Sequence, residues 1–200
     1  MRRSFMPRIL VFAGSTRTGA YSGRVADAAM KELALQGAEI TRISLADYPL
    51  PIMDQNLEKE KGIPENAVKL ARLFVEHDGI LIATPEYNGS MPPLLKNAID
   101  WISRVRQDRG QSLRPLPGKV VAICSSSDGH FAGIRSAGHL RAVLAHIQMD
   151  VIAPQVSVPN AGEAFGEDGD FREERLRNGM KRLCGALIER AATLSTRADG

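Results

Sequence analysis

The chain has 200 residues, of which 44% are hydrophobic and 24% are charged, and its formal net charge is +3. This length and composition are typical of one globular domain with one core, and they exclude disordered, collagen-like and disulfide-scaffold proteins. The small charge argues against a nucleic-acid partner, because the densest basic stretch, residues 172–182, is interleaved with Glu173 and Glu174 as on a solvated helix face.

The two cysteines, Cys124 and Cys184, lie in an apolar run and in a helical pattern. This placement favours buried, reduced thiols over a disulfide, and it fits a reducing compartment. No metal site is expected, because no cysteines and histidines cluster together. Residues 1–7 lack the apolar segment of a secretion signal, and no apolar run approaches the roughly 20 residues that span a bilayer, so we expect a cytoplasmic protein without membrane contact.

Short apolar segments alternate with segments of helical periodicity along the chain. The first strand is expected at Arg8–Ala13, and a helix follows over Ser22–Gln36 and stops at Gly37. Glu39–Leu45 alternates apolar and polar residues, as a more exposed strand does. Ala46–Gly62 is polar and contains prolines, which predicts a long loop.

The middle of the chain repeats this alternation. Pro64 is expected to open a helix that runs to Glu76, and the apolar run Gly79–Ala83 is typical of a central parallel strand. A helix is expected over Pro92–Arg104 and a loop over Gln107–Gly118. The remaining segments are predicted, in order, as a strand Lys119–Cys124, a helix Gly133–Gln148, a strand Asp150–Val158, a loop Asn160–Asp170 and a helix Phe171–Leu194.

This order of elements predicts an α/β fold. Five strands that alternate with helices indicate a doubly wound parallel sheet with helices on both faces. Pro154 within the last strand predicts an edge position or a bulge. We expect a single domain over residues 1–200, with flexible ends at 1–7 and 195–200.

Ligands of an open doubly wound sheet bind beyond the carboxyl ends of its strands, so the loops that follow strands are the expected site. The loop after the first strand, residues 14–22, is rich in glycine and hydroxyl side chains and leads into a helix, as phosphate-binding loops do. Arg17 adds a forked cation that suits phosphate oxygens. In the alternative interpretation, Ser22 is only a helix N-cap and Arg17 a surface charge. The loop lacks the Walker and G-x-G-x-x-G patterns, which argues against ATP or direct dinucleotide binding.

Two further loops complete the expected site. Thr84–Ser90 is rigid and sharply turned, and its backbone groups, free of the sheet, can bind a flat heteroaromatic ring. The alternative is an ordinary tight turn at Asn88–Gly89. Residues 125–133 form a small, flexible loop that can close over the other edge of the same ring.

These segments carry a resemblance to a known family. The run GSTR at 14–17, the run TPEYNGSMPPLLKNAIDW at 84–101 and the Ser/Gly-rich segment before Gly133 resemble the NADPH-dependent FMN reductases, which include bacterial quinone, chromate and azo-dye reductases. The resemblance extends from about Arg8 to about Pro159. It implies a flavodoxin-like fold with strand order 2-1-3-4-5, FMN as cofactor, and NADPH or NADH as co-substrate.

The resemblance also implies roles for individual residues. The phosphate of FMN is assigned to Ser15, Arg17 and Ser22; the isoalloxazine and ribityl parts to Pro85, Glu86, Tyr87, Asn88 and the adjacent Gly89; and a third contact to Ser125 and Gly133. Two departures put contacts in doubt: the family's Ser-x-Asn is Ser22-Gly23-Arg24 here, and its glycine pair is Ala132-Gly133. No side chain is expected as a general acid or base, because the flavin carries the chemistry.

The function implied is an FMN-dependent oxidoreductase. Hydride passes from NAD(P)H to FMN, and a quinone, chromate, azo, ferric or flavin acceptor is then reduced in a ping-pong scheme. The family forms homodimers or homotetramers with the flavin near the subunit interface, so Lys96 and Asp100 form either a pair within their helix or a contact between subunits. The alternatives are a flavodoxin-like electron carrier, although such carriers tend to be acidic, and a flavin-free binding module. The candidates for reading the 2′-phosphate of NADPH are Arg17, Arg24, Arg106 and Arg109.

Overall fold

The computed structural model describes residues 6–198, with side chains described through residue 195. Five parallel strands form one sheet in the order β2-β1-β3-β6-β7. Their bounds are β1 Arg8–Ala13, β2 Glu39–Ile43, β3 Gly79–Pro85, β6 Val120–Ser126 and β7 Asp150–Val158. Counted along the chain, the sheet strands have the order 2-1-3-4-5, so the predicted flavodoxin-like, doubly wound topology is confirmed.

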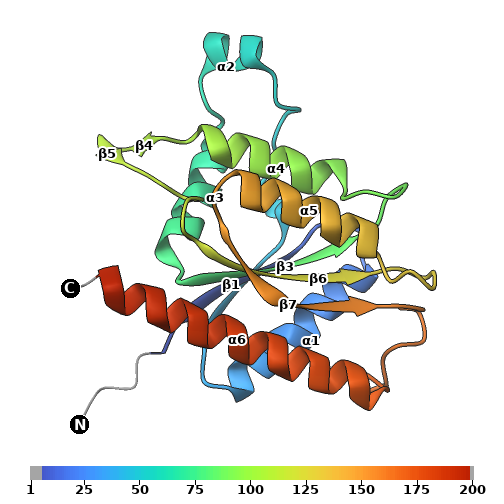
Figure 1. Ribbon diagram of the computed structural model, residues 1–200. Coiled ribbons are helices and arrows are strands. Elements are labelled where there is room, and N and C mark those ends of the chain that lie inside the picture. The colour runs from blue at the N-terminus through green and yellow to red at the C-terminus, as the bar shows by residue number, and fades with distance from the viewer. Residues whose placement is uncertain (1–5, 199–200) are drawn as a thin grey trace.

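Helices cover both faces of the sheet (Figure 1). One face carries α1 Tyr21–Leu35 and α6 Glu174–Ala198, and the other carries α3 Glu65–Glu76, α4 Pro93–Arg104 and α5 Ile134–His146. Side chains of β6 alternate between two apolar layers, with Ala122 and Cys124 facing α1 and α6, and Val121 and Ile123 facing the other helices. Because both faces of the inner strands are buried, these strands are apolar runs without alternation in the sequence.

The edge position predicted for the last strand is confirmed. β7 pairs with β6 only, and its register slips between Val121 and Ile123, opposite the segment that contains Pro154. A bulge at this point lets a residue without an N–H lie in the strand. The two cysteines are free and buried, as expected, and burial raises the pKa of the Cys124 thiol to about 12 and raises that of Cys184 as well.

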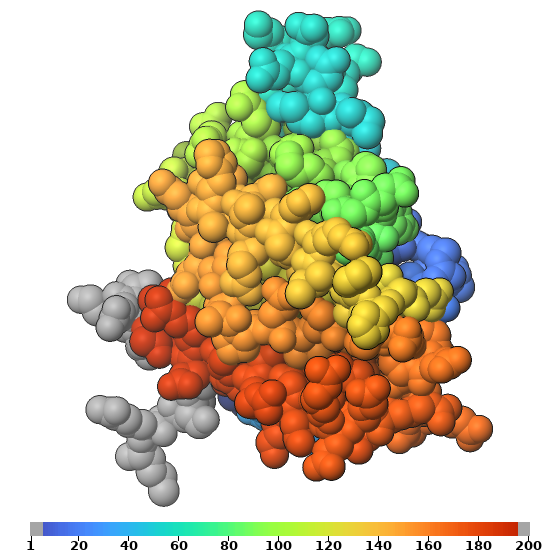
Figure 2. Space-filling view, turned by 45° about the vertical axis from the view of Figure 1, so that its right-hand side comes forward, coloured from blue at the N-terminus to red at the C-terminus, as the bar shows by residue number. Residues whose placement is uncertain are grey.

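The loop predicted over Ala46–Gly62 is wrong in part. A short 3-10 turn, η1 Leu45–Asp47, overlaps its start, because β2 ends at Ile43 and not at Leu45. The segment also contains a helix, α2 Gln55–Lys61, which stands out from the body of the molecule (Figures 1 and 2). The sequence of α2 has no apolar stripe, and none of its residues is fully buried, although Leu57 packs partly buried against the core. Its local signals are caps instead: the Asp54 carboxylate accepts from the amides of Asn56 and Leu57, and Gly62 ends the helix at φ +77°.

Other boundaries differ less. A two-stranded hairpin, β4 Gln107–Asp108 and β5 Gln111–Ser112, lies within the loop predicted at Gln107–Gly118. α6 begins later than Phe171 and continues past Leu194 to Ala198. The flexible ends were predicted over residues that include 1–5 and 199–200, which lie outside the described residues. Between residues 6 and 198, no helix is both long and apolar enough to cross a membrane.

Candidate active site

The loops after β1 and β3 meet at the carboxyl edge of the sheet. The Gly14 amide donates to the Ala83 carbonyl at 2.8 Å, and a Cβ on Gly14 would lie 3.1 Å from Leu95 Cδ2 and 3.4 Å from Pro85 Cδ. This close approach explains a glycine directly after the strand. Beyond it, Ser15 Oγ lies 3.4 Å from the Tyr87 hydroxyl oxygen. Two of the segments predicted to form the site are therefore in contact.

The start of α1 has the features of an anion-binding site. Its N-cap is Ala20, which has no side-chain acceptor, so Ser22 lies inside the first turn and the N-cap interpretation of Ser22 is wrong. Within residues 6–198, no protein acceptor is found for the amides of Tyr21, Ser22 and Gly23. Ser22 Oγ is also buried and unpartnered, with the residue 1% exposed. Amides and a hydroxyl without acceptors at a helix N-terminus suit a phosphate.

A hollow of about 200 Å³ adjoins this loop. It is lined by Ser15, Thr16, Arg17, Gly19, Ala20, Gly23, Arg24, Asp27, Arg42 and Ser44. Arg17 is exposed and weakly held, with Nη1 3.4 Å from the Thr18 carbonyl and the guanidinium 5.7 Å from the centre of the Tyr21 ring. Arg42 was not predicted as a site residue. The available signal was its place near the carboxyl end of β2, beside β1.

The loop after β3 contains the tight turn that was the alternative interpretation. The Tyr87 amide donates to the Ser90 carbonyl at 2.9 Å, and the Ser90 amide donates back at 3.1 Å. Asn88 and Gly89 between them have φ of 50° and 80°, as a two-residue hairpin turn requires. The backbone groups of Tyr87 are therefore occupied, contrary to the expectation that they are free. The Tyr87 side chain remains 46% exposed beside Ser15.

The carboxylate of Glu86 joins this loop to the start of α5. Glu86 Oε1 lies 2.6 Å from Arg135 Nη1, and Oε2 accepts from the Arg135 amide at 3.2 Å. The neighbouring Pro85 carbonyl accepts from Ser136 Oγ at 2.8 Å, and that hydroxyl lies 2.8 Å from Thr84 Oγ1. The carboxylate of Glu86 is therefore already paired within the protein. Arg135 and Ser136 were not predicted as site residues, because the sequence places them 49 or more positions away in a helix.

The buried Ser125 hydroxyl fixes the loop after β6 through hydrogen bonds. Ser125 is fully buried, and its Oγ donates to the Ala132 carbonyl and lies close to Ser157 Oγ, both at 2.8 Å. Ala132 and Gly133 have φ of 56° and 74°, and a Cβ on Gly133 would lie 3.0 Å from the Ser126 carbonyl oxygen. Ser125 and Gly133 therefore shape this loop, and the methyl group of Ala132 occupies a left-handed position that favours glycine.

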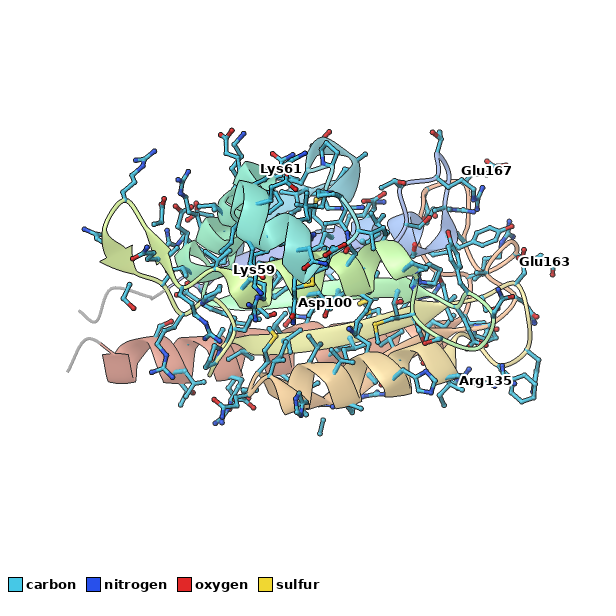
Figure 3. All side chains as sticks on the ribbon, turned by 90° about the horizontal axis from the view of Figure 1, so that it is seen from above. Lys59, Lys61, Asp100, Arg135, Glu163 and Glu167 are labelled. Carbon is cyan, nitrogen blue, oxygen red and sulfur yellow. The ribbon has the colours of Figure 1, made fainter. Side chains whose placement is uncertain are left out.

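The loop after β7 reaches the same edge. The Ala161 amide donates to the Ser127 carbonyl at 3.1 Å, and the Gly162 amide lies 3.3 Å from Asp128 Oδ1. A Cβ on Gly162 would lie 3.2 Å from the Tyr21 hydroxyl oxygen. Figure 3 shows Glu163 of this loop and Arg135 of α5 at the same end of the molecule. The predicted loops and this additional one therefore gather at one edge of the sheet.

The fold and this edge define a class of protein. In the order β2-β1-β3, the chain reverses direction across the sheet between β1 and β3, and Ser15 and Tyr87 meet at that switch point. A doubly wound sheet of this order is a flavodoxin-like domain, and the unpaired amides at the start of its first helix suit a phosphate-bearing cofactor.

The comparisons with known proteins name the family. Residues 7–163 match the model of the NADPH-dependent FMN reductases. The chain is 38% identical to the quinone reductase of Escherichia coli over 146 residues, 72% of this chain and 73% of that protein. It is 31% identical to the NAD(P)H-dependent FMN reductase of Pseudomonas aeruginosa over 182 residues, 90% and 92% of the two chains.

A solved structure agrees at the level of the fold. The flavoenzyme NAD(P)H:(acceptor) oxidoreductase FerB from Paracoccus denitrificans superposes with a TM-score of 0.77, over 94% of this chain and 98% of that one, at 23% identity. The chain belongs to the NADPH-dependent FMN reductase family. It is an oxidoreductase with FMN as cofactor and NAD(P)H as co-substrate, and its acceptors are small molecules.

Proposed function

We propose that FMN lies along the carboxyl edge of the sheet with its phosphate at the start of α1 and its ring beside the turn at residues 85–89. The observation that carries this proposal is the buried, unpartnered Ser22 hydroxyl, together with the three unpaired amides at the same helix terminus. A buried hydroxyl without a partner is costly in a native protein, and a phosphate oxygen satisfies it. Ser15 and Arg17 stand on the same loop and complete the contacts to the phosphate.

The residues of the second loop orient the ring. Tyr87 is held beside Ser15, and the turn to Ser90 leaves the amides of Asn88 and Gly89 without acceptors among the described residues. These amides are donors for the oxygens and nitrogens of the ring, and such preorganised dipoles favour negative charge on it. Glu86 has an indirect, positioning role, because its carboxylate is paired with Arg135 and holds the start of α5 in place. Bound FMN itself supplies the hydride and electron transfer.

We propose a ping-pong scheme in which NAD(P)H and then the acceptor use the same face of the site. The acceptors are quinones first, as the name of the Escherichia coli relative suggests, and then chromate, azo compounds, ferric chelates or free flavin. The chain's role is to orient the two reactants in turn and to exclude water. Steady-state rates measured over a grid of NADPH and quinone concentrations are expected to give parallel double-reciprocal lines. Intersecting lines would refute the scheme and leave the family assignment standing.

An absorption spectrum tests the cofactor site directly. Purified protein reconstituted with FMN is expected to show flavin bands that bleach when NADPH or NADH is added without oxygen. Bands that both nucleotides leave unchanged would favour an electron carrier, and a protein that FMN cannot reconstitute would favour a flavin-free module.

Assembly as a homodimer or homotetramer is also proposed. Within one chain, Lys96 Nζ lies 2.7 and 2.9 Å from the carboxylate oxygens of Asp100, so this pair is satisfied inside its own helix and does not require a partner subunit. Light scattering coupled to size exclusion measures the assembly, and a monomer at micromolar concentration would refute the proposal.

A further inference from the structure

The hollow beside the phosphate loop is lined by more residues than the proposed contacts to the FMN phosphate use. Its near half is the loop of residues 15–20, and its far half is formed by Arg24 and Asp27 of α1 with Arg42 and Ser44 at the end of β2. The proposed FMN contacts use only the near half. The far half therefore contributes two arginines, Arg24 and Arg42, that the proposed function has not used.

Both guanidinium groups make contacts within the chain. The guanidinium carbon of Arg24 lies 4.4 Å from the centre of the buried Phe165 ring, and Arg24 forms no ion pair with any described residue. Arg42 donates through Nε to Asp27 Oδ1 at 3.1 Å and through Nη1 to the Ile43 carbonyl at 2.6 Å. Its Nη2 has no acceptor among residues 6–198. A fixed fork with free N–H groups loses little entropy when it binds an anion.

The charge balance suits a phosphate monoester. Arg24 and Arg42 carry two positive charges against the single negative charge of Asp27. Asp27 is paired with Arg42 through one carboxylate oxygen, Oδ1, so its charge offsets only part of the positive charge of the two arginines. Ser44 Oγ accepts from the Ala46 amide at 3.2 Å and keeps its own proton to donate.

The other arginines considered from the sequence lie elsewhere. Arg109 is at the tip of the β4–β5 hairpin, and Arg106 immediately precedes that hairpin. The hairpin is tied to α3 through the ion pair of Asp108 with Arg72, near the end of α3 that leads into the start of β3. It therefore lies at the amino edge of the sheet, opposite the site loops (Figure 1). Within one chain, only Arg17 and Arg24 of the four candidates line the hollow.

We propose that the far half of the hollow binds the 2′-phosphate of NADPH, with Arg24 and Arg42 as the residues that select NADPH over NADH. This inference rests on the proposed function, because it requires that the nicotinamide reaches FMN bound on the adjacent loop. A phosphate of the co-substrate then occupies a place next to, but separate from, the phosphate of FMN.

The test compares the two nucleotides in matched variants of the FMN-loaded protein. Arg42→Ala and Arg24→Ala are each expected to lower kcat/KM for NADPH about tenfold or more, the range for a charge-assisted hydrogen bond, and to change that for NADH less than about twofold. Arg190→Ala is the control, because Arg190 forms a similar pair with Asp150, Nε to Oδ2 at 2.6 Å, at the start of β7 on the opposite edge of the sheet. It is expected to leave both values unchanged.

A binding measurement provides a readout that does not depend on turnover. Calorimetric titration of the FMN-loaded protein with adenosine 2′,5′-bisphosphate is expected to give tighter binding than titration with 5′-AMP, and Arg42→Ala is expected to remove the difference. Equal binding of the two nucleotides by the unmodified protein would overturn the inference. Variants that lose NADH and NADPH activity equally would also overturn it, since the arginines would then act on FMN. Variants that lose neither activity would overturn it as well. Failure of the proposed function is recognised separately, as FMN bands that neither NADPH nor NADH bleaches in the unmodified protein.

Discussion

The ion pair between Glu86 and Arg135 is expected to be the main tie between the loop after β3 and the start of α5. Arg135→Met removes the cation 2.6 Å from Glu86 Oε1 and leaves a carboxylate whose side chain is only 11% exposed. Breaking a buried pair costs about 3–5 kcal/mol and an exposed pair about 0.2–1 kcal/mol. Because the Arg135 side chain is 50% exposed, we expect an intermediate loss of about 2 kcal/mol, which includes its contact with the Phe131 ring at 4.6 Å.

The double variant separates the charge from the packing. Adding Glu86→Gln to Arg135→Met removes the unpaired carboxylate, while the new amide oxygen can still accept from the backbone amide of residue 135. We therefore expect the double variant to recover about 1 kcal/mol of the loss. Urea unfolding of the FMN-free protein gives the three free energies of unfolding, with Lys96→Met as a control that removes an exposed intrahelical pair and costs about 0.5 kcal/mol or less. A double variant no more stable than Arg135→Met alone would refute the reasoning.

Three further outcomes follow from the site and the core. Ser22→Ala is expected to leave the FMN-free protein as stable or slightly more stable, because it removes a buried hydroxyl without a partner. The same variant is expected to bind FMN about tenfold more weakly in a fluorescence titration. Unchanged FMN affinity would count against Ser22 as a phosphate ligand. Ala132→Gly is expected to raise the free energy of unfolding by about 0.5–1 kcal/mol, because Ala132 has φ 56°. Gly133→Ala is expected to lower it by more than about 2 kcal/mol, because the new Cβ would lie 3.0 Å from a backbone oxygen. Thermal unfolding that shows the same sign for both variants would contradict this. Burial raises the pKa of the Cys124 thiol to about 12 from an unfolded value of 9.0, so we expect this thiol to react with a thiol reagent at pH 8 only after unfolding. Its contribution to stability is expected to be complete below about pH 9 and to be lost as the pH rises towards 12. Rapid labelling of this cysteine in the native protein would show that it is not buried.

Much of the fold was predictable because its signals are local. The apolar runs at β1, β3 and β6 have the form of strands buried on both faces, and the intervening segments have helical periodicity, so the alternation alone indicates a doubly wound parallel sheet. The same pattern identifies the loops after strands as the expected site, since the carboxyl ends of parallel strands share an edge. The sequence does not predict α2, because none of its residues is fully buried and its only signals are the cap at Asp54 and the glycine that ends it.

The use of each side chain at that edge was decided by the tertiary structure. Glu86 and Ser125 both stand in loops predicted to touch FMN, yet the first is paired with Arg135 and the second holds Ala132 and Ser157. Burial of Ser22 without a partner depends on how α1 packs on the sheet. Such contacts join segments far apart in the chain, and periodicity carries no information about them.

The sequence by itself therefore determined the kind of sheet, the order of its elements and the loops in which a cofactor site is expected, because each of these follows from the spacing of apolar residues and from turn chemistry along a short stretch of chain. Only the tertiary structure decided which hydroxyls and amides at that edge remain without partners, and that Arg42 of β2 lies across one hollow from Arg24 of α1. The physical reason is that a polar group is free or occupied according to its neighbours in space, and these are set when the helices dock on the sheet.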